Sequence, residues 1–452
     1  MLGYGAATRK ADLSASVGLV QNMDVVKNRP VTDAAAMLQG QIPGVTIRNL
    51  GGEPSAEAKI TIRGEGSRKD ESVLWVVDGV PGAPFNINDV ESIVVLKDAA
   101  SAAIYGAYSG SAGVIMVTTK KGSTGKAMIT YEGSYGISKA TNLPQSLTIE
   151  QQRQVRELAY KNGSGAALPS GWDVSKNPYI GTTHTDWIDA ITRTAPFQRH
   201  YITLSGGSET LTNRLSFLYT DNEGTLLNTF HKELNLRYDA TYKFGKHIRL
   251  REDAFFKTWD NRSTSTDSGG GGVISGALTM PHSAEAYYSD GTFGGTAPKD
   301  QEYKDKYGSN FADLHGDNIN PLRILLAESL LRKPITFNSS TFLEIADVIP
   351  GLKFTSRFTY KLDKTFDKTF TPMRTEPGKP LLNNSVSYES STFYKWEVEN
   401  TLNYDKVFGD HHVGALVSTT ANKQRGLSFG TSNGMLETKT LSTSIWNLEH
   451  QV

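Results

Sequence analysis

The chain carries, at residues 126–137, the run KAMITYEGSYGI, in which polar residues alternate with apolar or small ones. The apolar or small face holds Ala127, Ile129, Tyr131, Gly133, Tyr135 and Ile137, and the polar face holds Thr130, Glu132 and Ser134. A period of two is typical of a β-strand with two unlike faces. The sequence upstream of residue 126 lacks this period, so the chain divides into two parts here.

Three further segments, 234–242, 352–362 and 396–405, alternate in the same way. They are longer than the roughly five or six residues usual in soluble sheets and match the length of a tilted membrane crossing. One face suits lipid and the other a water-filled lumen. The pattern favours a transmembrane β-barrel over a soluble β-sandwich, whose strands also alternate.

Connection lengths point the same way. We expect short turns at 222–224 and 244–246 and long polar loops at 259–335 and 364–387. Short turns on one rim and long loops on the other are typical of outer-membrane barrels.

The composition excludes several other classes. Basic and acidic residues both number 47, so net charge favours neither nucleic acid nor an acidic ligand as a partner. The absence of cysteine excludes a disulfide framework and a thiolate metal site. No run approaches the ~20 apolar residues of a membrane-spanning helix. The start of the chain has no secretion signal, so either the protein stays inside the cell or its true N-terminus is missing here.

The first part of the chain, up to about residue 122, predicts a compact α/β unit. Short apolar runs separated by Gly-Gly, Asp-Gly and Pro-Gly pairs indicate strands and tight turns. The expected strands are 45–48, 59–62, 73–77, 92–96 and 114–119, and the expected helices are 32–39 and 98–105.

Five blocks in this first part strongly resemble the plug of SusC/RagA-type TonB-dependent outer-membrane transporters. They are LQGQIPGV at 38–45, ITIRG at 60–64, LWVVDGVP at 74–81, VESIVVLKDAASAAIYG at 90–106 and GVIMVTTKKG at 113–122. Their order makes the signal specific, although any one block alone would be weak. The segment 107–112 departs from the family, because it is one residue longer than usual and lacks an arginine often found there.

The resemblance implies an α+β plug domain at 1–122, including a preceding linker, followed by antiparallel transmembrane β-barrel strands at 123–452. Such a barrel closes with about 22 strands, whereas roughly ten are expected here. The second part is therefore expected to be all-β, an incomplete N-terminal part of the barrel with long extracellular loops, and the chain a fragment.

The plug motifs supply candidate structural or gating residues: Arg63, Gly64, Asp78, Gly79, Glu91, Lys97, Asp98, Tyr105 and Gly106. Arg63 can pair with a carboxylate at the plug–barrel boundary, or it is an ordinary strand-end residue. Asp78-Gly79 is expected to form a tight turn, with the glycine at positive φ. For Asp78, Gly79 and Asp98 an ordinary turn or cap role is favoured.

Four aromatic residues in the expected loops are candidates for stacking on a ligand: Trp172, Tyr179, Tyr287 and Tyr288. The alternative, which is the more common outcome, is that they form the loops' own small core. No catalytic residue, metal site or cofactor is expected, because no convergent constellation is present; His411 and His412, for example, would point to opposite faces of a strand.

The resemblance implies import of a bulky nutrient across the outer membrane of a Gram-negative bacterium. Its expected partners are TonB of the inner-membrane energising complex, a SusD-like surface lipoprotein and outer-membrane lipid, with no nucleic acid. Oligosaccharide is the substrate class implied first and peptide second. The alternatives are a surface carbohydrate-binding or adhesion β protein without transport, and a soluble periplasmic hydrolase.

Overall fold

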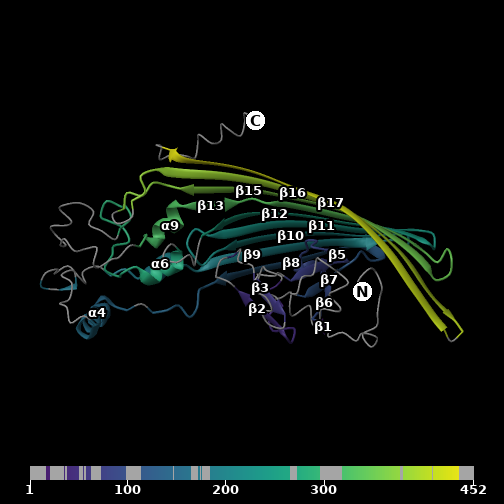
Figure 1. The fold of residues 1–452 in the computed structure, drawn as a ribbon, viewed down its shortest axis with the longest axis horizontal. Coiled ribbons are helices and arrows are strands. Elements are labelled where there is room, and N and C mark those ends of the chain that lie inside the picture. Colours follow the sequence, from purple (N-terminus) through teal and green to yellow (C-terminus); the bar gives the residue numbers. More distant parts are fainter. Residues whose placement is uncertain are drawn as a thin grey trace.

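The computed structural model holds two units, a small N-terminal one and a large curved sheet that lies over it (Figure 1). The structure describes residues 17–20, 35, 38–49, 54, 58–62, 73–97, 113–145, 147–163, 172–173, 175, 184–264, 272–295, 318–376, 380–409 and 411–436. Among the helices of these residues, none is both long and apolar enough to cross a membrane.

The N-terminal unit is built on a five-stranded sheet of order β1-β6-β7-β4-β5, in which only β4 and β7 are parallel. Its strands are β1 (Val17–Leu19), β4 (Leu74–Val77), β5 (Val80–Pro81), β6 (Val90–Leu96) and β7 (Val114–Thr119), with a separate hairpin of β2 (Val45–Asn49) and β3 (Ala58–Ile62). Runs rich in valine and isoleucine form these strands because branched side chains pack well on a pleated surface. Ile93, Val95 and Ile115 are completely buried in the core.

The large sheet is antiparallel throughout and follows the chain order. Its strands are β8 (Gly125–Ser138), β9 (Ala195–Gly207), β10 (Leu211–Glu223), β11 (Phe230–Phe244), β12 (Ile248–Ser263), β13 (Ser329–Arg332), β14 (Ile335–Ala346), β15 (Leu352–Thr371), β16 (Asn384–Phe408) and β17 (His411–Leu436). Both β13 and β14 lie between β12 and β15. Pro334 stands in the gap between them, where its missing N–H interrupts the ladder.

The two rims of the large sheet differ in the length of their connections. The turns at 208–210, 245–247, 347–351 and 409–410 form one rim. The opposite rim carries the connections 139–194, 224–229, 264–328 and 372–383. The expectation of a short turn at 222–224 is corrected here: residues 224–229 link β10 to β11 on the long-loop rim, where Leu226 packs among the loop helices.

Among the described residues, four helices lie on the long-loop rim: α4 (Ile149–Gly163), α5 (Trp187–Ile191), α6 (Val273–Thr279) and α9 (Pro321–Ala327). Asp186 caps α5 by accepting from the N–H groups of Ile188 and Asp189, as N-cap aspartates do. Helices α5, α6 and α9 share an apolar cluster with Trp187 at its centre. The long connections therefore have a core of their own.

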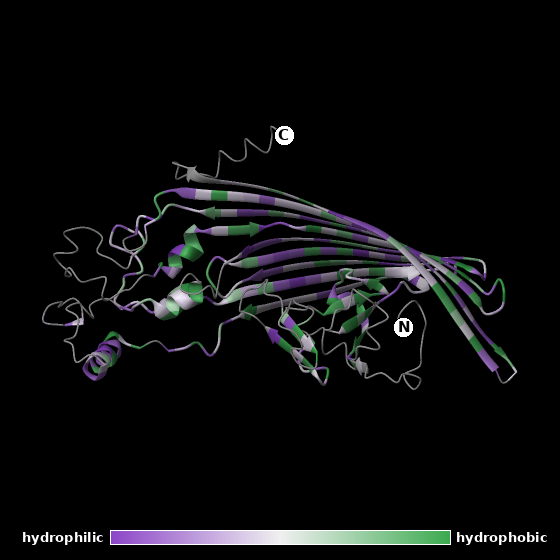
Figure 2. Cartoon of the chain, in the orientation of Figure 1, coloured by the Kyte–Doolittle hydropathy of each residue, from purple (hydrophilic) through white to green (hydrophobic). Residues whose placement is uncertain are grey.

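The faces of the large sheet are reversed relative to a water-soluble protein. Along β11 the buried side chains are polar, and most of the exposed ones are apolar. The buried set is His231, Asn235, Arg237 and Asp239, and the exposed set is Leu236, Tyr238 and Tyr242. Figure 2 shows the alternation along the strands. The polar face contacts the N-terminal unit, through Arg237 and Arg251 among others.

Candidate functional site at the contact between the two units

The two-residue turn between β4 and β5 points at the large sheet. Asp78 and Gly79 join β4 to β5 with φ of 50° and 86°, the positive values that a two-residue hairpin turn of type I′ requires. Aspartate tolerates this conformation and glycine adopts it without strain. The Asp78 N–H donates to the Val117 carbonyl at 2.9 Å, which fixes the turn on β7.

The Asp78 carboxylate reaches cations of both units. Its Oδ2 lies 2.7 Å from Lys121 Nζ, 3.0 Å from Arg237 Nη2 on β11 and 3.1 Å from Arg251 Nη2 on β12. Thr119 donates to the same carboxylate through its N–H and its hydroxyl. The side chain is 6% exposed, so these partners replace water almost completely.

Two further carboxylates complete the group, which we name the charge cluster. Asp239 accepts from Arg251 Nε at 2.9 Å, and Asp253 accepts from Arg251 Nη2 at 2.9 Å and from Arg237. The members are Asp78, Lys121, Arg237, Asp239, Arg251 and Asp253. Three carboxylates face three cations, so the cluster as a whole is neutral although each of its side chains carries a charge.

The protonation state of Asp78 follows from its neighbours. Burial alone would raise its pKa, but Lys121, Arg251 and Arg237 outweigh burial and hold the pKa well below its ordinary value. The carboxylate is therefore charged at neutral pH. Removing one partner of such a buried ionic group leaves an uncompensated charge, which costs about 3–5 kcal/mol.

Arg357 on β15 holds the same turn from another strand. It donates to the Gly79 carbonyl and, through Nη2, to Glu397 at 3.0 Å and Glu399 at 2.8 Å. The two glutamates orient the guanidinium toward the turn. Strands β11, β12 and β15 thus all bind one tight turn.

A second contact lies at the 3-10 helix η2 (Ile87–Asp89). The buried Asp89 carboxylate accepts from the Tyr201 hydroxyl at 2.6 Å and lies 3.4 Å from Arg214 Nη2. Arg214 also donates to the Tyr201 oxygen at 2.6 Å. The three groups form a closed triangle between η2, β9 and β10.

The chain passes from one unit to the other along the sheet wall. At Gly122 an added Cβ would lie 2.5–2.7 Å from backbone atoms of Asn213, closer than real Cβ atoms come. Only glycine fits between the two backbones. The linker is therefore pressed against β10 directly after Lys121.

Comparison with known proteins identifies both units. The family model of the TonB-dependent Receptor Plug Domain matches residues 9–114. TonB-dependent receptor P3 of Formosa agariphila is 30% identical over 424 residues, which cover 92% of this chain and 39% of that protein. The chain belongs to the TonB-dependent receptor family. TonB-dependent receptor SusC of Bacteroides thetaiotaomicron is 33% identical over 309 residues, 64% of this chain and 28% of that protein.

The chain spans less than half the length of these curated receptors. Among solved structures, the RagAB peptide importer in its 'open-open' state superposes with a TM-score of 0.77 and 24% identity, covering 98% of this chain and 50% of that chain. This likeness supports the fold of a SusC/RagA-type receptor, with the N-terminal unit as plug and the large sheet as barrel strands. Such receptors are outer-membrane proteins of Gram-negative bacteria and not enzymes.

The plug motif residues take different places in this receptor. Asp78 and Gly79 form the turn expected of them and also bind the barrel wall. Lys97 donates to the Pro43 carbonyl at 2.6 Å, inside the plug. The Glu91 side chain is exposed on β6, and no hydrogen bond or ion pair joins it to the part of the chain that the structure describes. Five other candidates lie outside the described residues: Arg63, Gly64, Asp98, Tyr105 and Gly106.

The loop aromatics lie mostly inside the loops. Trp172 is 2% exposed, with Arg156 over its ring, and Tyr288 is 7% exposed, with its hydroxyl accepting from the Gly295 N–H. Their ring faces are not open to a ligand, because other side chains cover them. Tyr287 is 43% exposed and packs beside Phe293. Tyr179 lies outside the described residues.

The wall residues that hold the plug were missed by the sequence reasoning. A signal was available, because Arg237 and Asp239 share the polar face of one strand and Arg251 and Asp253 that of the next. In a lumen-facing strand, such charge pairs indicate a buried partner. Among the described residues, no group of three acidic or histidine side chains could hold a metal.

Proposed function

We propose that this chain is the plug (1–122) and the first part (123–452) of a barrel of about 22 strands that imports a bulky nutrient across the outer membrane. The observation that carries the proposal is the plug packed on the polar wall through buried charges. A plug placed there blocks the lumen until it is moved.

The proposed energy source is TonB of the inner-membrane complex, which pulls the N-terminal end of the plug. The wall contacts suit this task because they are polar. When the charge cluster opens, water can hydrate each group, so the net loss is limited to about 1.5–3 kcal/mol for each hydrogen bond to a charged group. No bond of the solute is broken, so no catalytic residue is needed.

Oligosaccharide is the proposed nutrient class, with peptide second because the plug and strands superpose on a peptide importer. A SusD-like lipoprotein is the proposed partner at the long-loop rim. The exposed apolar side chains of the barrel strands would contact outer-membrane lipid. In the described part of the chain, no residue set favours binding of nucleic acid.

The test is uptake by cells that express the protein from its native gene, with and without TonB. Fluorescent neutral oligosaccharides and peptides of matched size serve as solutes. We expect uptake of one class that disappears when TonB is deleted while surface binding is kept. Uptake that continues unchanged without TonB would contradict the proposal.

A further inference from the structure

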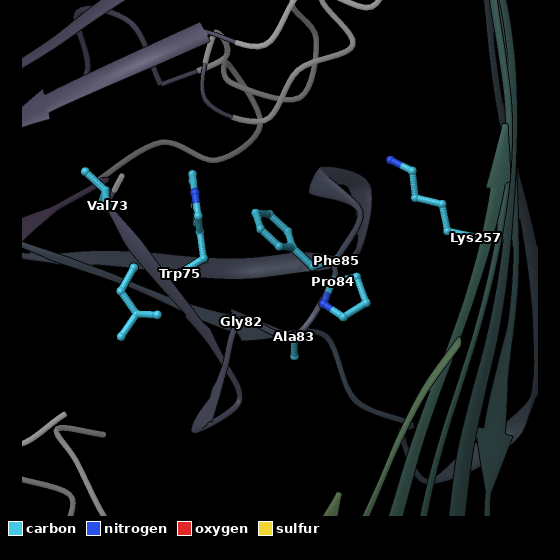
Figure 3. A pocket seen from close by; sticks show the side chains of 8 residues that line it. Val73, Trp75, Gly82, Ala83, Pro84, Phe85 and Lys257 are labelled. Carbon is cyan, nitrogen blue, oxygen red and sulfur yellow. The ribbon is translucent and has the colours of Figure 1, made fainter. Parts of the chain in front are cut away.

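The lysines of the barrel wall differ in their partners according to the face they occupy. On the plug-facing side, Lys257 of β12 extends toward Phe85 of the plug (Figure 3), and its Nζ lies 2.8 Å from Glu233 Oε2. Lys395 of β16, on the same face, lies 2.8 Å from Glu397. The positive charge of these two lysines is therefore compensated within the protein.

The opposite face of the large sheet, which we call the outer face, carries a tall apolar stretch on β11. Its members are Leu234, Leu236, Tyr238, Ala240, Tyr242 and Phe244. From the first to the last of them the strand rises about 34 Å, which at a tilt of about 40° gives a height of about 26 Å. The apolar band of an outer-membrane barrel is about 25 Å tall. The stretch therefore has the height of the hydrocarbon layer.

A line of lysines ends the apolar stretch on the side of the long-loop rim. The next outward position beyond it holds Lys232 on β11, Lys333 directly before β14 and Lys364 on β15, and all three are exposed. The strand register places Lys364 on the face of Leu234, because directly opposite residues of an antiparallel pair share a face. These lysines therefore lie at the level where the hydrocarbon ends.

The line is not balanced by acidic residues along its whole length. Lys333 Nζ lies 3.5 Å from Asp260 Oδ2 of β12. In the described part of the chain, no carboxylate forms an ion pair with Lys364 or with Lys368, which is four residues farther along the outer face of β15. The β15 end of the line therefore carries two uncompensated positive charges.

An aromatic pair lies between these two charges. Phe366 stands between Lys364 and Lys368 on the outer face of β15, and its ring centroid is 5.7 Å from that of Tyr388 on β16. Lys368 Nζ lies 5.6 Å from the centre of the Tyr388 ring. Along an extended strand, residues four apart are separated by about 13 Å. The outer face thus presents two cations with a ring surface between them.

We propose that Lys364 and Lys368 bind the two phosphates of a bisphosphorylated glycolipid headgroup in the outer leaflet of the membrane. The long loops of such barrels are extracellular, which places both lysines in that leaflet. Lipid phosphates lie just outside the hydrocarbon layer, at the level of the lysines, and clustered lysines attract anionic headgroups.

The arrangement favours a glycolipid over a phospholipid. A disaccharide with a phosphate at each end spans a distance comparable to that between the two lysines, and its apolar ring faces can pack on Phe366 and Tyr388. A phospholipid with a single phosphate meets one lysine at a time. The inference goes beyond the import function, because it concerns the outer face and no part of the lumen.

The test uses the full-length protein expressed from its native gene and purified in a zwitterionic detergent. The probes are bisphosphoryl lipid A, monophosphoryl lipid A, phosphatidylglycerol and phosphatidylethanolamine, and bound lipid is measured by native mass spectrometry. The variants are Lys364→Gln, Lys368→Gln, both together, and Lys364→Arg with Lys368→Arg. The matched control is Lys406→Gln, because Lys406 is on the outer face of β16 at the short-turn rim, 5.0 Å from the centre of the Phe408 ring.

We expect bisphosphoryl lipid A to bind most tightly and to bind more weakly at higher salt. Each lysine beside an anionic lipid surface contributes about fivefold to the affinity, so the double glutamine variant should bind this lipid about 30-fold more weakly. The double arginine variant and Lys406→Gln should bind as the wild type does. All variants should show the heat-modifiable gel migration of a folded barrel. The single glutamine variants, each about fivefold weaker, serve as the test if the double variant does not fold.

Three outcomes would overturn the proposal. The first is unchanged affinity for bisphosphoryl lipid A in the folded glutamine variants. The second is an equal loss of affinity in Lys406→Gln. The third is binding of phosphatidylglycerol or phosphatidylethanolamine as tightly as bisphosphoryl lipid A, which would leave no role for a second phosphate.

Discussion

The plug meets the barrel wall through charged and polar side chains, whereas helices α5, α6 and α9 of the long-loop rim meet through apolar ones. Trp187 and Val273 are completely buried in the rim cluster. Apolar burial contributes about 25 cal/mol per Å² to stability, and this contribution is lost in full when water covers the separated surfaces. The ions of the charge cluster, in contrast, are hydrated when they separate. The rim is therefore suited to stay assembled, and the plug contact is suited to open.

The largest expected effect is in the rim. Trp187→Ala removes a buried ring and its hydrogen bond to the Pro281 carbonyl, at a cost of about 3–5 kcal/mol. The long loops should then be cleaved faster by protease on intact cells, while the plug stays in place. The control is Leu326→Ala on α9, where the side chain is 41% exposed and little change is expected. Equal cleavage of both variants would remove the distinction between the two regions.

A somewhat smaller effect is expected at the charge cluster. Asp78→Asn leaves three cations with two carboxylates, which should weaken plug retention by about 3 kcal/mol. Cells should become more sensitive to vancomycin, which is too large for ordinary leakage. The matched control is Asp405→Asn, whose carboxylate pairs with His412 at an exposed site far from the plug contact. Unchanged sensitivity in Asp78→Asn would show that the cluster does not hold the plug.

The second contact should contribute less. Tyr201→Phe removes the hydroxyl between Asp89 and Arg214 but leaves these two 3.4 Å apart. The contact should lose about 1 kcal/mol of stability, which should be visible as faster amide hydrogen exchange around η2. Combined with Asp78→Asn, the effects should add, because Tyr201 is uncharged and its hydroxyl bonds Asp89 and Arg214, which are not members of the charge cluster. A loss as large as that of Asp78→Asn would mean that the two contacts act as one.

The smallest effect is expected from mild acid. Burial would raise the pKa of Asp78, but Lys121, Arg251 and Arg237 hold it well below the ordinary value of about 3.9. Because its pKa is lowered, the ionised Asp78 carboxylate stabilises the contact at every pH above the ordinary pKa. This contribution is lost only as the pH falls through the folded-state pKa. Leak conductance in planar bilayers should therefore be the same at pH 7 and pH 5. A rise at pH 5 would assign plug retention to other groups.

Several elements could be predicted because their signals are local. The expected strands 45–48 and 114–119 correspond to β2 (Val45–Asn49) and β7 (Val114–Thr119). The alternation after residue 126 correctly predicted strands with two unlike faces, since every second side chain shares a face. The connection between β10 and β11, residues 224–229, was assigned to the wrong rim of the sheet, because the length of a connection does not show which rim it lies on.

The sequence by itself determined the strands, their faces and the conformation of the Asp78-Gly79 turn, because period and turn chemistry act between near neighbours. Only the tertiary structure decided what the turn binds. Arg237, Arg251 and Arg357 lie 159, 173 and 278 residues from their partners in the turn. Their meeting depends on strand register, barrel curvature and the docking of the plug, which are set by contacts across the whole fold.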